Sequence, residues 1–231
     1  MSVFSISDLH LSINSDKPMD VFGPVWENSF EKIQTDWLNK VTDDDIVLLC
    51  GDLSWAMKLE DAIEDIKMLN NLPGKKILLK GNHDYWWQGI TSLRNVLPKN
   101  FYAIQNDALK IDNYIFCGTR GWIIPENKQN TEDNVKIYKR EVERLKLSFS
   151  QMQKLRNNGD KVICLMHYPP FNQNIEDTDF TKLIEENKVD AVVFGHLHSN
   201  LSGYKLKTNK NNIEYFLTSC DLINNNLIKI L

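Results

Sequence analysis

Histidines and acidic residues recur in short clusters along this chain. The clusters are Asp8 with His10 in "SDLH", Asp52 in "CGDL", Asn82-His83-Asp84 in "KGNHD", His167 in "MHYPP", and His196 with His198 in "FGHLH". All five histidines of the protein lie in these clusters, and none lies in the long charged stretches between them. Because histidines that serve only packing or solubility would be spread more evenly, the clusters indicate a metal or catalytic site.

The spacing inside the clusters suits metal binding. In D-x-H and H-x-H the two side chains are two residues apart, so they emerge on the same side of an extended backbone. Carboxylate, imidazole and amide ligands suit Mn²⁺, Fe²⁺, Co²⁺, Ni²⁺ or Zn²⁺ better than Ca²⁺, which prefers oxygen ligands. A lone histidine such as His167 would more often be structural, but the set as a whole favours a metal site. The candidate ligands are too many for one tetrahedral ion and predict two ions that share one carboxylate: Asp8, His10, Asp52, Asn82, His167, His196 and His198.

Each cluster follows an apolar run that is typical of a buried strand. The strand-like runs cover residues 3–6, 46–50, 77–79, 114–117, 162–166 and 191–194, and amphipathic stretches cover 25–40, 59–71, 132–156 and 180–187. Strands separated by helices favour parallel pairing, and ligands of such sheets bind outside the carboxyl ends of the strands. We therefore expect the clusters to meet at one edge of the fold, with the glycines before Asp52, Asn82 and His196 forming sharp turns.

The end of the chain has a different pattern. Strand-like segments at residues 201–207, 213–217 and 227–231 are separated by Asn-rich turns at 209–212 and 224–226, with no room for helices. This pattern predicts an antiparallel portion. The fold class is therefore α/β, with two sheets flanked by helices. We expect residues 1–231 to form a single domain, in which a loop and a mostly solvated helix at about 119–157 shape the substrate site.

Composition limits the possible functions. The chain has 231 residues, a formal net charge of −4 and no basic stripe, which argues against extended nucleic acid as a partner. No apolar stretch approaches the ~20 residues that span a bilayer, and the N-terminus lacks the features of a signal peptide. The four cysteines are scattered, which is typical of reduced thiols in a cytoplasmic protein. The sequence does not specify an oligomeric state.

Taken in order, the clusters resemble the motifs of the calcineurin-like metallophosphoesterase family. Its pattern D-x-H, G-D, G-N-H-[DE], H and G-H-x-H appears in full between residues 8 and 198. The resemblance implies a four-layer α/β/β/α sandwich of two mixed sheets with a dinuclear metal centre at one edge, where iron in either oxidation state is a further candidate. It also implies that Asp52 bridges the ions, that the first ion is bound by Asp8, His10 and His198, and that the second is bound by Asn82, His167 and His196.

The resemblance further implies a reaction. The substrate would be a small phosphomonoester or phosphodiester, nucleotides included, attacked in line by a hydroxide bound between two metal ions ~3.5–4 Å apart. No covalent enzyme intermediate is needed. In the family the histidine at the position of His83 is not a ligand and assists the leaving group, typically by ~10²–10⁴-fold in rate. The alternative for His83 is a supporting role in fixing the turn.

One position departs from the family pattern. Many members have G-D-x-x-D, whose second Asp pairs with the active-site histidine, whereas this chain has Trp55 at that position. Without that carboxylate, and beside two dications, His83 is expected to be largely neutral in the resting enzyme. Asp84 is an alternative partner from the adjacent position. The metal ligands are not affected by this difference.

Other residues near the motifs are candidates for the substrate pocket. Among the neighbouring aromatic residues we expect Trp55 and Trp122 near its mouth, where an aryl group or nucleobase would stack on them. Arg120 would either clamp a phosphate oxygen or form a surface salt bridge. Phosphomonoester, phosphodiester and pyrophosphate substrates all remain open.

Two other classes of function have less support in the sequence. An inert protein-binding scaffold with the same fold would be expected to have lost ligands, but this chain retains them. The H-x-H-x-D-H run of metallo-β-lactamase-type hydrolases and the P-loop of nucleoside triphosphatases are both absent. The prediction is therefore a metal-dependent phosphoric ester hydrolase.

Overall fold

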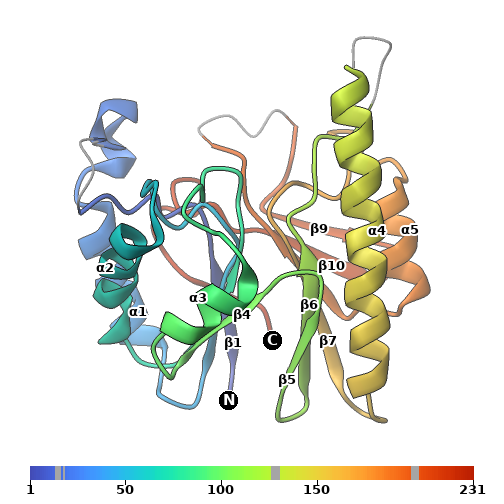
Figure 1. Cartoon of the computed structure of the whole chain (residues 1–231), viewed down its shortest axis with the longest axis horizontal. Coiled ribbons are helices and arrows are strands. Elements are labelled where there is room, and N and C mark those ends of the chain that lie inside the picture. The colour runs from blue at the N-terminus through green and yellow to red at the C-terminus, as the bar shows by residue number, and fades with distance from the viewer. Residues whose placement is uncertain (14–16, 18, 126–130, 199–202) are drawn as a thin grey trace.

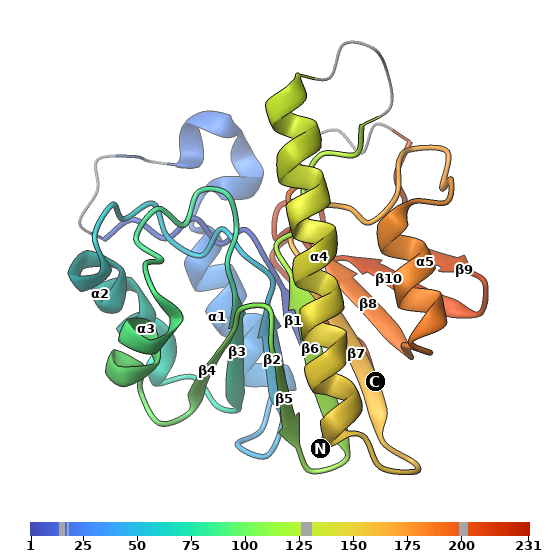
Figure 2. The ribbon, with the colours of Figure 1, turned by 45° about the vertical axis from the view of Figure 1, so that its right-hand side comes forward.

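Two mixed sheets pack face to face, and helices cover both outer faces (Figure 1, Figure 2). The computed structural model describes residues 1–13, 17, 19–125, 131–198 and 203–231. The strand order of the first sheet is β11 (Ile228–Lys229), β1 (Val3–Ile6), β2 (Ile46–Leu49), β3 (Lys75–Leu79) and β4 (Phe101–Ile104). The strand order of the second sheet is β5 (Ala108–Ile111), β6 (Tyr114–Thr119), β7 (Lys161–Met166), β8 (Ala191–Phe194), β10 (Ile213–Leu217) and β9 (Lys207–Lys210).

The helices form the two outer layers. On the first sheet lie α1 (Ser29–Lys40), α2 (Leu59–Asn70) and α3 (Ile90–Val96), preceded along the chain by the short 3-10 helices η1 (Met19–Phe22) and η2 (Pro24–Trp26). On the second sheet lie α4 (Glu132–Leu155) and α5 (Asp179–Glu186). The predicted four-layer α/β/β/α fold is confirmed.

Side chains of the central strands alternate between two cores. In β2, Val47 and Leu49 pack with the helices of the first outer layer, whereas Ile46 and Leu48 pack between the sheets. This alternation follows from the pleat of a strand, which points successive side chains to opposite faces. Because both faces of these strands are buried, each strand appears in the sequence as a continuous apolar run.

Parallel pairing aligns the ends of the central strands. β1 to β4 are parallel in the first sheet, as are β6, β7, β8 and β10 in the second. Among the strands that the structure describes, only the edge strands β11, β5 and β9 pair antiparallel. The strands that precede the histidine and acidic clusters therefore end at one edge of the molecule, the upper edge in Figure 1.

Several predicted elements differ from the structure. The strand predicted at 201–207 is instead β9, Lys207–Lys210, so the predicted turn begins two residues later, and residues 201 and 202 lie outside the described part. The final predicted strand is only the short β11, which joins the first sheet. Three further elements, β4, β5 and α3, were not predicted from the sequence. β5 is half-buried along its whole length, so it lacks the continuous apolar run of a central strand.

The prediction that the helix at 132–156 is mostly solvated is wrong for one of its sides. α4 is amphipathic, and its inner side packs over β5 and β6 with these buried residues: Tyr138, Glu141, Val142, Leu145, Ser148, Phe149 and Met152. Their spacing of three and four residues is that of a helix face. Part of the preceding loop, residues 126–130, lies outside the described residues.

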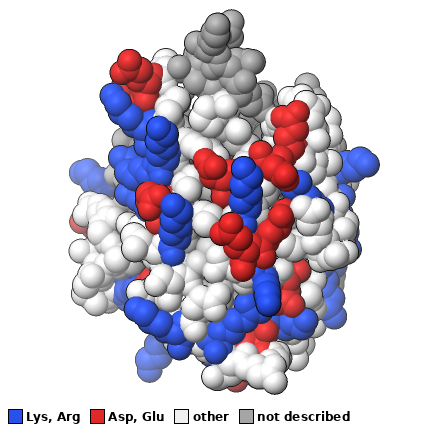
Figure 3. Space-filling model, turned by 90° about the vertical axis from the view of Figure 1, so that its right-hand side faces the viewer, with Lys and Arg blue, Asp and Glu red and all other residues white. Residues whose placement is uncertain are grey.

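The face of the molecule at α4 and α5 has mixed charge. Figure 3 shows Lys and Arg interspersed with Asp and Glu over this face. A surface of this kind lacks the single-sign stripe that extended nucleic acid requires. In the described ranges, no helix is both long and apolar enough to cross a membrane.

Asp45 ties the start of the chain to the turn before β2. Its buried carboxylate accepts hydrogen bonds from the backbone N–H of Ser2 at 2.6 Å and from the N–H and hydroxyl of Thr42, both at 2.9 Å. Burial acts to raise the pKa of Asp45, but these hydrogen bonds outweigh burial and lower the pKa below its ordinary value.

We expect Asp45→Ala to lower the free energy of unfolding by about 1 kcal/mol near pH 7, because partly buried N–H donors lose their charged acceptor. Since the folded-state pKa of Asp45 is depressed, the stabilisation is present above the unfolded-state pKa and is lost as the pH falls through the folded-state value. Urea unfolding at neutral and acidic pH measures both effects. Asp43→Ala, at an exposed position in the same turn, is the control. A wild-type-to-variant difference that does not change with pH would contradict this account.

Candidate metal centre

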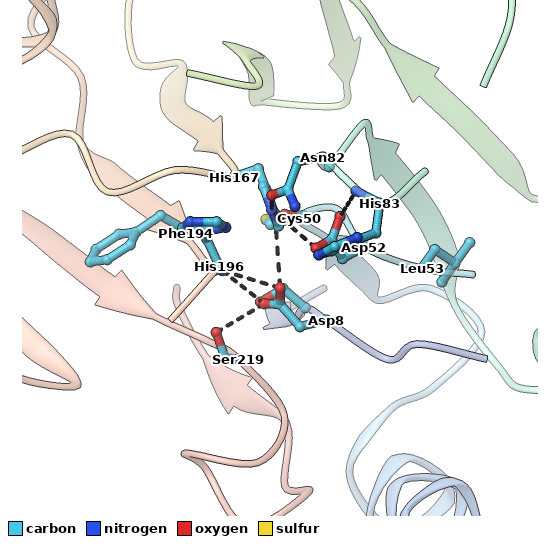
Figure 4. A network of polar contacts seen from close by, with 12 residues as sticks. Asp8, Cys50, Asp52, Leu53, Asn82, His83, His167, Phe194, His196 and Ser219 are labelled. Carbon is cyan, nitrogen blue, oxygen red and sulfur yellow. Dashed lines mark hydrogen bonds and ion pairs between the residues drawn. The ribbon is translucent and has the colours of Figure 1, made fainter. Parts of the chain in front are cut away.

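The clusters predicted from the sequence meet at the edge where the parallel strands end. Figure 4 shows the labelled acidic, amide and imidazole groups turned toward one another, whereas Leu53 and Phe194 point away. Asp8 and His196 are 188 residues apart in the sequence, yet the backbone N–H of His196 donates to the Asp8 carboxylate at 3.0 Å. The structure therefore brings together residues from both sheets.

One group of candidate ligands consists of Asp8, His10 and His198. Their nearest ligand atoms all lie within 4.8 Å of one another. Nε2 of His198 is 3.4 Å from Nε2 of His10 and 3.6 Å from Oδ1 of Asp8. Two imidazole nitrogens that face each other beside a carboxylate form an arrangement that a shared cation would satisfy.

A second group consists of Asp52, His167 and His196, again with ligand atoms within 4.8 Å of one another. Nε2 of His167 is 3.4 Å from Oδ2 of Asp52 and 2.7 Å from Oδ1 of Asn82, so the amide joins this group. Nδ1 of His167 is 4.0 Å from Oδ1 of Asp8, which places the two groups side by side. All seven predicted ligands therefore lie in one two-part cluster.

Four of the seven residues have an uncommon backbone conformation. The φ angles are 59° at Asp8, 49° at His10, 50° at Asp52 and 73° at His196. Residues other than glycine rarely adopt positive φ, and such conformations gather at functional sites because the surrounding structure must hold them. The turns after β1, β2 and β8 are therefore shaped to aim side chains into the cluster.

The glycines before the ligands have two different roles. Gly51 has φ of +97° and forms the predicted sharp turn. Gly81 and Gly195 do not have positive φ, so the prediction of a glycine-specific turn is wrong for them. A Cβ on Gly81 would overlap Asp52, and one on Gly195 would overlap Asp8. These two glycines provide space for the carboxylates.

Hydrogen bonds from hydroxyl groups orient the Asp8 carboxylate. Oδ2 of Asp8 accepts from the hydroxyl of Ser7 at 2.6 Å and from that of Ser219 at 2.9 Å. Burial of Asp8 raises its pKa. A dication beside Asp8 would counter this cost by favouring the ionised form.

Two histidines are oriented by acceptors at Nδ1. Nδ1 of His198 is 2.9 Å from Oδ1 of Asp221, and Nδ1 of His167 is 3.0 Å from the carbonyl oxygen of Cys50. With the proton on Nδ1, each ring directs its Nε2 lone pair into the cluster, which is the usual arrangement of metal-binding histidines.

Ser219 and Asp221 were not among the residues predicted from the sequence. Both lie in "TSCD", which follows β10 as the other clusters follow their strands. They were missed because β10 was assigned to an antiparallel portion, whereas it pairs in parallel with β8 and ends at the same edge.

Protonation in the cluster suits ligand binding. Burial lowers the pKa of His10 and of His196 to about 3, so both are neutral. Burial also acts to lower the pKa of His167, but Asp52 and Asp8 outweigh it and raise that pKa to about 9. In Asp52, burial acts to raise the pKa, but the neighbouring His167 outweighs it and the pKa lies below the ordinary value. The metal-free cluster thus retains a proton on His167 that metal binding would release.

His83 lies beside the cluster without joining either ligand group. Its backbone N–H donates to Oδ1 of Asp52 at 2.7 Å, and its buried Nδ1 has no hydrogen-bond partner among the described residues. Burial lowers the pKa of His83, in agreement with the neutral resting form that was expected.

Trp55, at the position of the family's second Asp, forms an aromatic wall. Its ring centroid is 4.5 Å from that of His83 and 4.7 Å from that of His10, on which it stacks. Its indole N–H points to the sulfur of Met19 at 3.2 Å. The departure from the family pattern therefore replaces a charged partner of His83 by an apolar neighbour.

The predicted alternative that Asp84 pairs with His83 is wrong. The buried carboxylate of Asp84 instead accepts backbone N–H groups from Gly81 at 2.7 Å, from Asp52 and Leu53 at 2.9 Å each, and from Ser54 at 3.3 Å. It also accepts from the Trp86 indole at 3.0 Å. Asp84 thus joins the loops after β2 and β3.

Trp122 and Arg120 lie near the second ligand group, whereas Trp55 stacks on His10 of the first group. Trp122 lines a cavity of about 230 Å³ together with His196 and Tyr168, whose rings are 4.0 Å apart. The Arg120 guanidinium lies 4.6 Å from the centroid of the Trp122 ring and 3.6 Å from Oε1 of Glu141. Arg120 therefore forms a salt bridge, but its partner is a buried carboxylate and not one on the surface.

The remaining aromatic residues divide between the core and the cluster. Trp86 and Trp87 are buried in the core between the first sheet and its helices, and Tyr85 is exposed. Trp26 was missed, although its ring centroid is 5.7 Å from that of His198. It was missed because residues 25–28 were predicted to begin a helix, whereas η2 ends at Trp26 and α1 begins at Ser29.

Asp84→Asn is expected to lower the free energy of unfolding by about 3 kcal/mol. The single amide oxygen of Asn cannot accept all the hydrogen bonds that the two carboxylate oxygens of Asp84 accept, and the amide NH₂ group would point at N–H donors instead of accepting from them. Urea unfolding of EDTA-treated protein measures this loss without any contribution from metal. The exposed Glu143→Gln serves as the matched control. Equal stability of Asp84→Asn and the control would exclude the anchoring role.

The chain is similar to one known protein family and to solved structures of low sequence identity. No protein of curated function matches the chain. A solved structure of a protein of unknown function from Aquifex aeolicus is 18% identical, with a TM-score of 0.52 over 99% of this chain and 95% of that one. A predicted phosphoesterase from Streptococcus pneumoniae is 12% identical, with a TM-score of 0.39 over 94% of this chain and 71% of that one. The sequence model of the calcineurin-like phosphoesterases matches residues 1–200. The chain therefore belongs to the calcineurin-like phosphoesterase family.

Proposed function

We propose that this protein is a dinuclear metal-dependent hydrolase of small phosphomonoesters or phosphodiesters. The observation that carries the proposal is the pair of adjacent ligand groups, because each holds a carboxylate and two imidazoles with nitrogen and oxygen atoms close enough for one ion. The first ion would be bound by Asp8, His10 and His198.

The second ion would be bound by Asn82, His167 and His196, and Asp52 would bridge the two. Asp52 suits the bridging role because its charge acts on the pKa of His10 in the first group and of His167 in the second. The mixture of nitrogen and oxygen donors suits Mn²⁺, iron, Co²⁺, Ni²⁺ or Zn²⁺.

When bound, a metal pair supplies Lewis acidity toward phosphate oxygens and makes hydroxide available near neutral pH. The side chains of this protein provide the rest of the chemistry. His83 is neutral and therefore retains one ring N–H, which would donate to a phosphoryl or leaving-group oxygen. Its backbone hydrogen bond to Asp52 fixes the position of the ring relative to the ligand cluster. The Trp55 ring beside His83 would exclude water from that side.

The cavity at His196 is the proposed place for the leaving group. Its walls include Trp122, Tyr168 and Tyr204, and its volume of about 230 Å³ is open to the side of the second ligand group. Aromatic walls favour a flat leaving group, such as an aryl alcohol or a nucleoside, because stacking of a base contributes ~1–3 kcal/mol. A larger cavity of about 380 Å³ lies on the other side, at His10, and includes the acidic residues Asp20 and Glu31. Their charge makes that cavity less suited to an anionic substrate.

We further propose a cytoplasmic location. All four cysteines are buried and unpaired, as is usual in a reducing compartment.

Metal analysis tests the ligand assignment. Protein purified with Mn²⁺ is expected to contain two ions per chain by elemental analysis. The variant Asp52→Asn is expected to lose most of the bound metal and at least about 100-fold in kcat, because the bridging carboxylate loses its charge. Asp112→Asn, at an exposed turn, is the matched control and keeps both properties. Full metal content and rate in Asp52→Asn would refute the bridging role.

A substrate panel with a His83 variant tests the reaction. With Mn²⁺, we expect hydrolysis of p-nitrophenyl phosphate or bis-p-nitrophenyl phosphate, with cyclic nucleotides as the third substrate class. His83→Ala should lose about 10²–10⁴-fold in kcat with unchanged metal content, because the ring donates to the substrate and binds no ion. The exposed Tyr85→Phe is the control. Two bound ions without hydrolysis of any of these substrates would instead favour an inert scaffold.

A further inference from the structure

A third cavity, also of about 230 Å³, gathers positive charge at the place where the two sheets and α4 meet. Its wall includes four cations, Lys80, Arg120, Arg140 and Arg144, and one carboxylate, Glu141. Lys80 follows β3, Arg120 follows β6, and the other three residues lie on α4. Figure 2 shows α4 crossing in front of β6 and β7 of the second sheet. None of the candidate metal ligands lines this cavity, which we call the Arg120 pocket.

The single carboxylate of the Arg120 pocket is already fully engaged. Oε2 of the buried Glu141 accepts from the hydroxyl of Thr119 at 2.6 Å, and Oε1 lies 2.6 Å from Nη1 of Arg144 and 3.6 Å from Nη2 of Arg120. Among the described residues of the wall, one negative charge faces four positive charges, which is an excess of three positive charges. An excess of this kind attracts an anion.

Several donors of the pocket remain available. Nε of Arg120 is buried and has no hydrogen-bond partner among the described residues. Arg140 is exposed and forms no salt bridge within the described part of the chain. Nζ of Lys80 donates to the carbonyl oxygen of Trp87 at 3.0 Å, which uses one of its three hydrogens. Because a buried donor without an acceptor is costly, an anion in the pocket would relieve that cost.

We propose that the Arg120 pocket binds a phosphate group independently of the metal ions. Guanidinium groups present paired N–H donors that match two oxygens of a phosphate, and charge-assisted hydrogen bonds are the strong ones. Glu141 and Thr119 position Arg120 and Arg144 for this role. Polar side chains of Gln105 and Asn106 complete the wall with neutral hydrogen-bonding groups.

The pocket is connected by backbone to the metal centre. Lys80 is two residues before Asn82, and the carbonyl oxygen of Arg120 accepts the N–H groups of His167 at 3.1 Å and Tyr168 at 2.9 Å. The phosphate group would come either from free inorganic phosphate or from a phosphorylated organic molecule. Both sources share the tetrahedral oxyanion that the pocket recognises.

Isothermal titration of EDTA-treated, full-length protein with inorganic phosphate tests the proposal, because binding at the metal centre is removed. One saturable site per chain is expected, and Arg140→Gln and Arg120→Gln should each weaken binding by about tenfold or more. Lys136→Gln is the matched control, since it removes an exposed charge of the same helix outside the pocket. Circular dichroism and urea unfolding establish that each variant is folded; Arg140→Gln changes an exposed side chain and keeps the test informative if Arg120→Gln does not fold.

Two further arms complete the experiment. If the pocket accepts the phosphate group of an ester, methyl phosphate binds as tightly as inorganic phosphate. If the pocket accepts free phosphate alone, methyl phosphate binds more weakly. Both outcomes support the site. Asp52→Asn should bind phosphate normally, so failure of the hydrolase proposal and failure of this proposal are distinguishable. The absence of saturable binding, binding that is unchanged in folded Arg140→Gln, or an equal loss in Lys136→Gln would overturn the proposal.

Discussion

The metal centre depends on one buried carboxylate that is not a candidate ligand. Asp84 accepts four backbone N–H groups from the loops after β2 and β3 and thereby holds Asp52 and Asn82 in fixed positions. A carboxylate accepts several hydrogen bonds at once, and charge-assisted bonds are stronger than neutral ones. Burial, followed by the nearby charge of Asp52, raises the pKa of Asp84 to about 6, so the group is mainly ionised at neutral pH. The cost of burying this charge is offset by the donors that converge on it.

The geometry of the fold creates an electrostatic problem that cations resolve. Parallel strands from two sheets deliver two buried carboxylates and four imidazoles to one small space, where lone pairs face each other. In the metal-free state a proton on His167 relieves part of this repulsion, as the pKa of about 9 shows. A metal-dependent phosphoesterase uses the same concentration of donors to hold dications, so the feature that strains the apo protein is the one that equips it for catalysis.

Most of the centre could be predicted from the sequence because its geometry follows from strand alternation and parallel pairing alone. A ligand that follows a parallel strand reaches the common edge whatever the intervening sequence, which is why Asp8 and His196 were correctly expected to meet. Ser219 and Asp221 obey the same rule but were missed, since the partner of β10 cannot be deduced from a short strand with turns on both sides. The contacts of Trp26 and the anchoring role of Asp84 depend on loop conformations that have no periodic pattern.

The position of Asp221 in the chain affects which substitutions can change the cation preference of the metal centre. The family's sequence model matches residues 1–200, whereas Asp221, beyond that stretch, is 2.9 Å from Nδ1 of His198. A carboxylate at this place increases the electron-donating strength of the ring toward a bound cation. The preference among cations can therefore drift through substitutions in the terminal segment while every ligand stays the same.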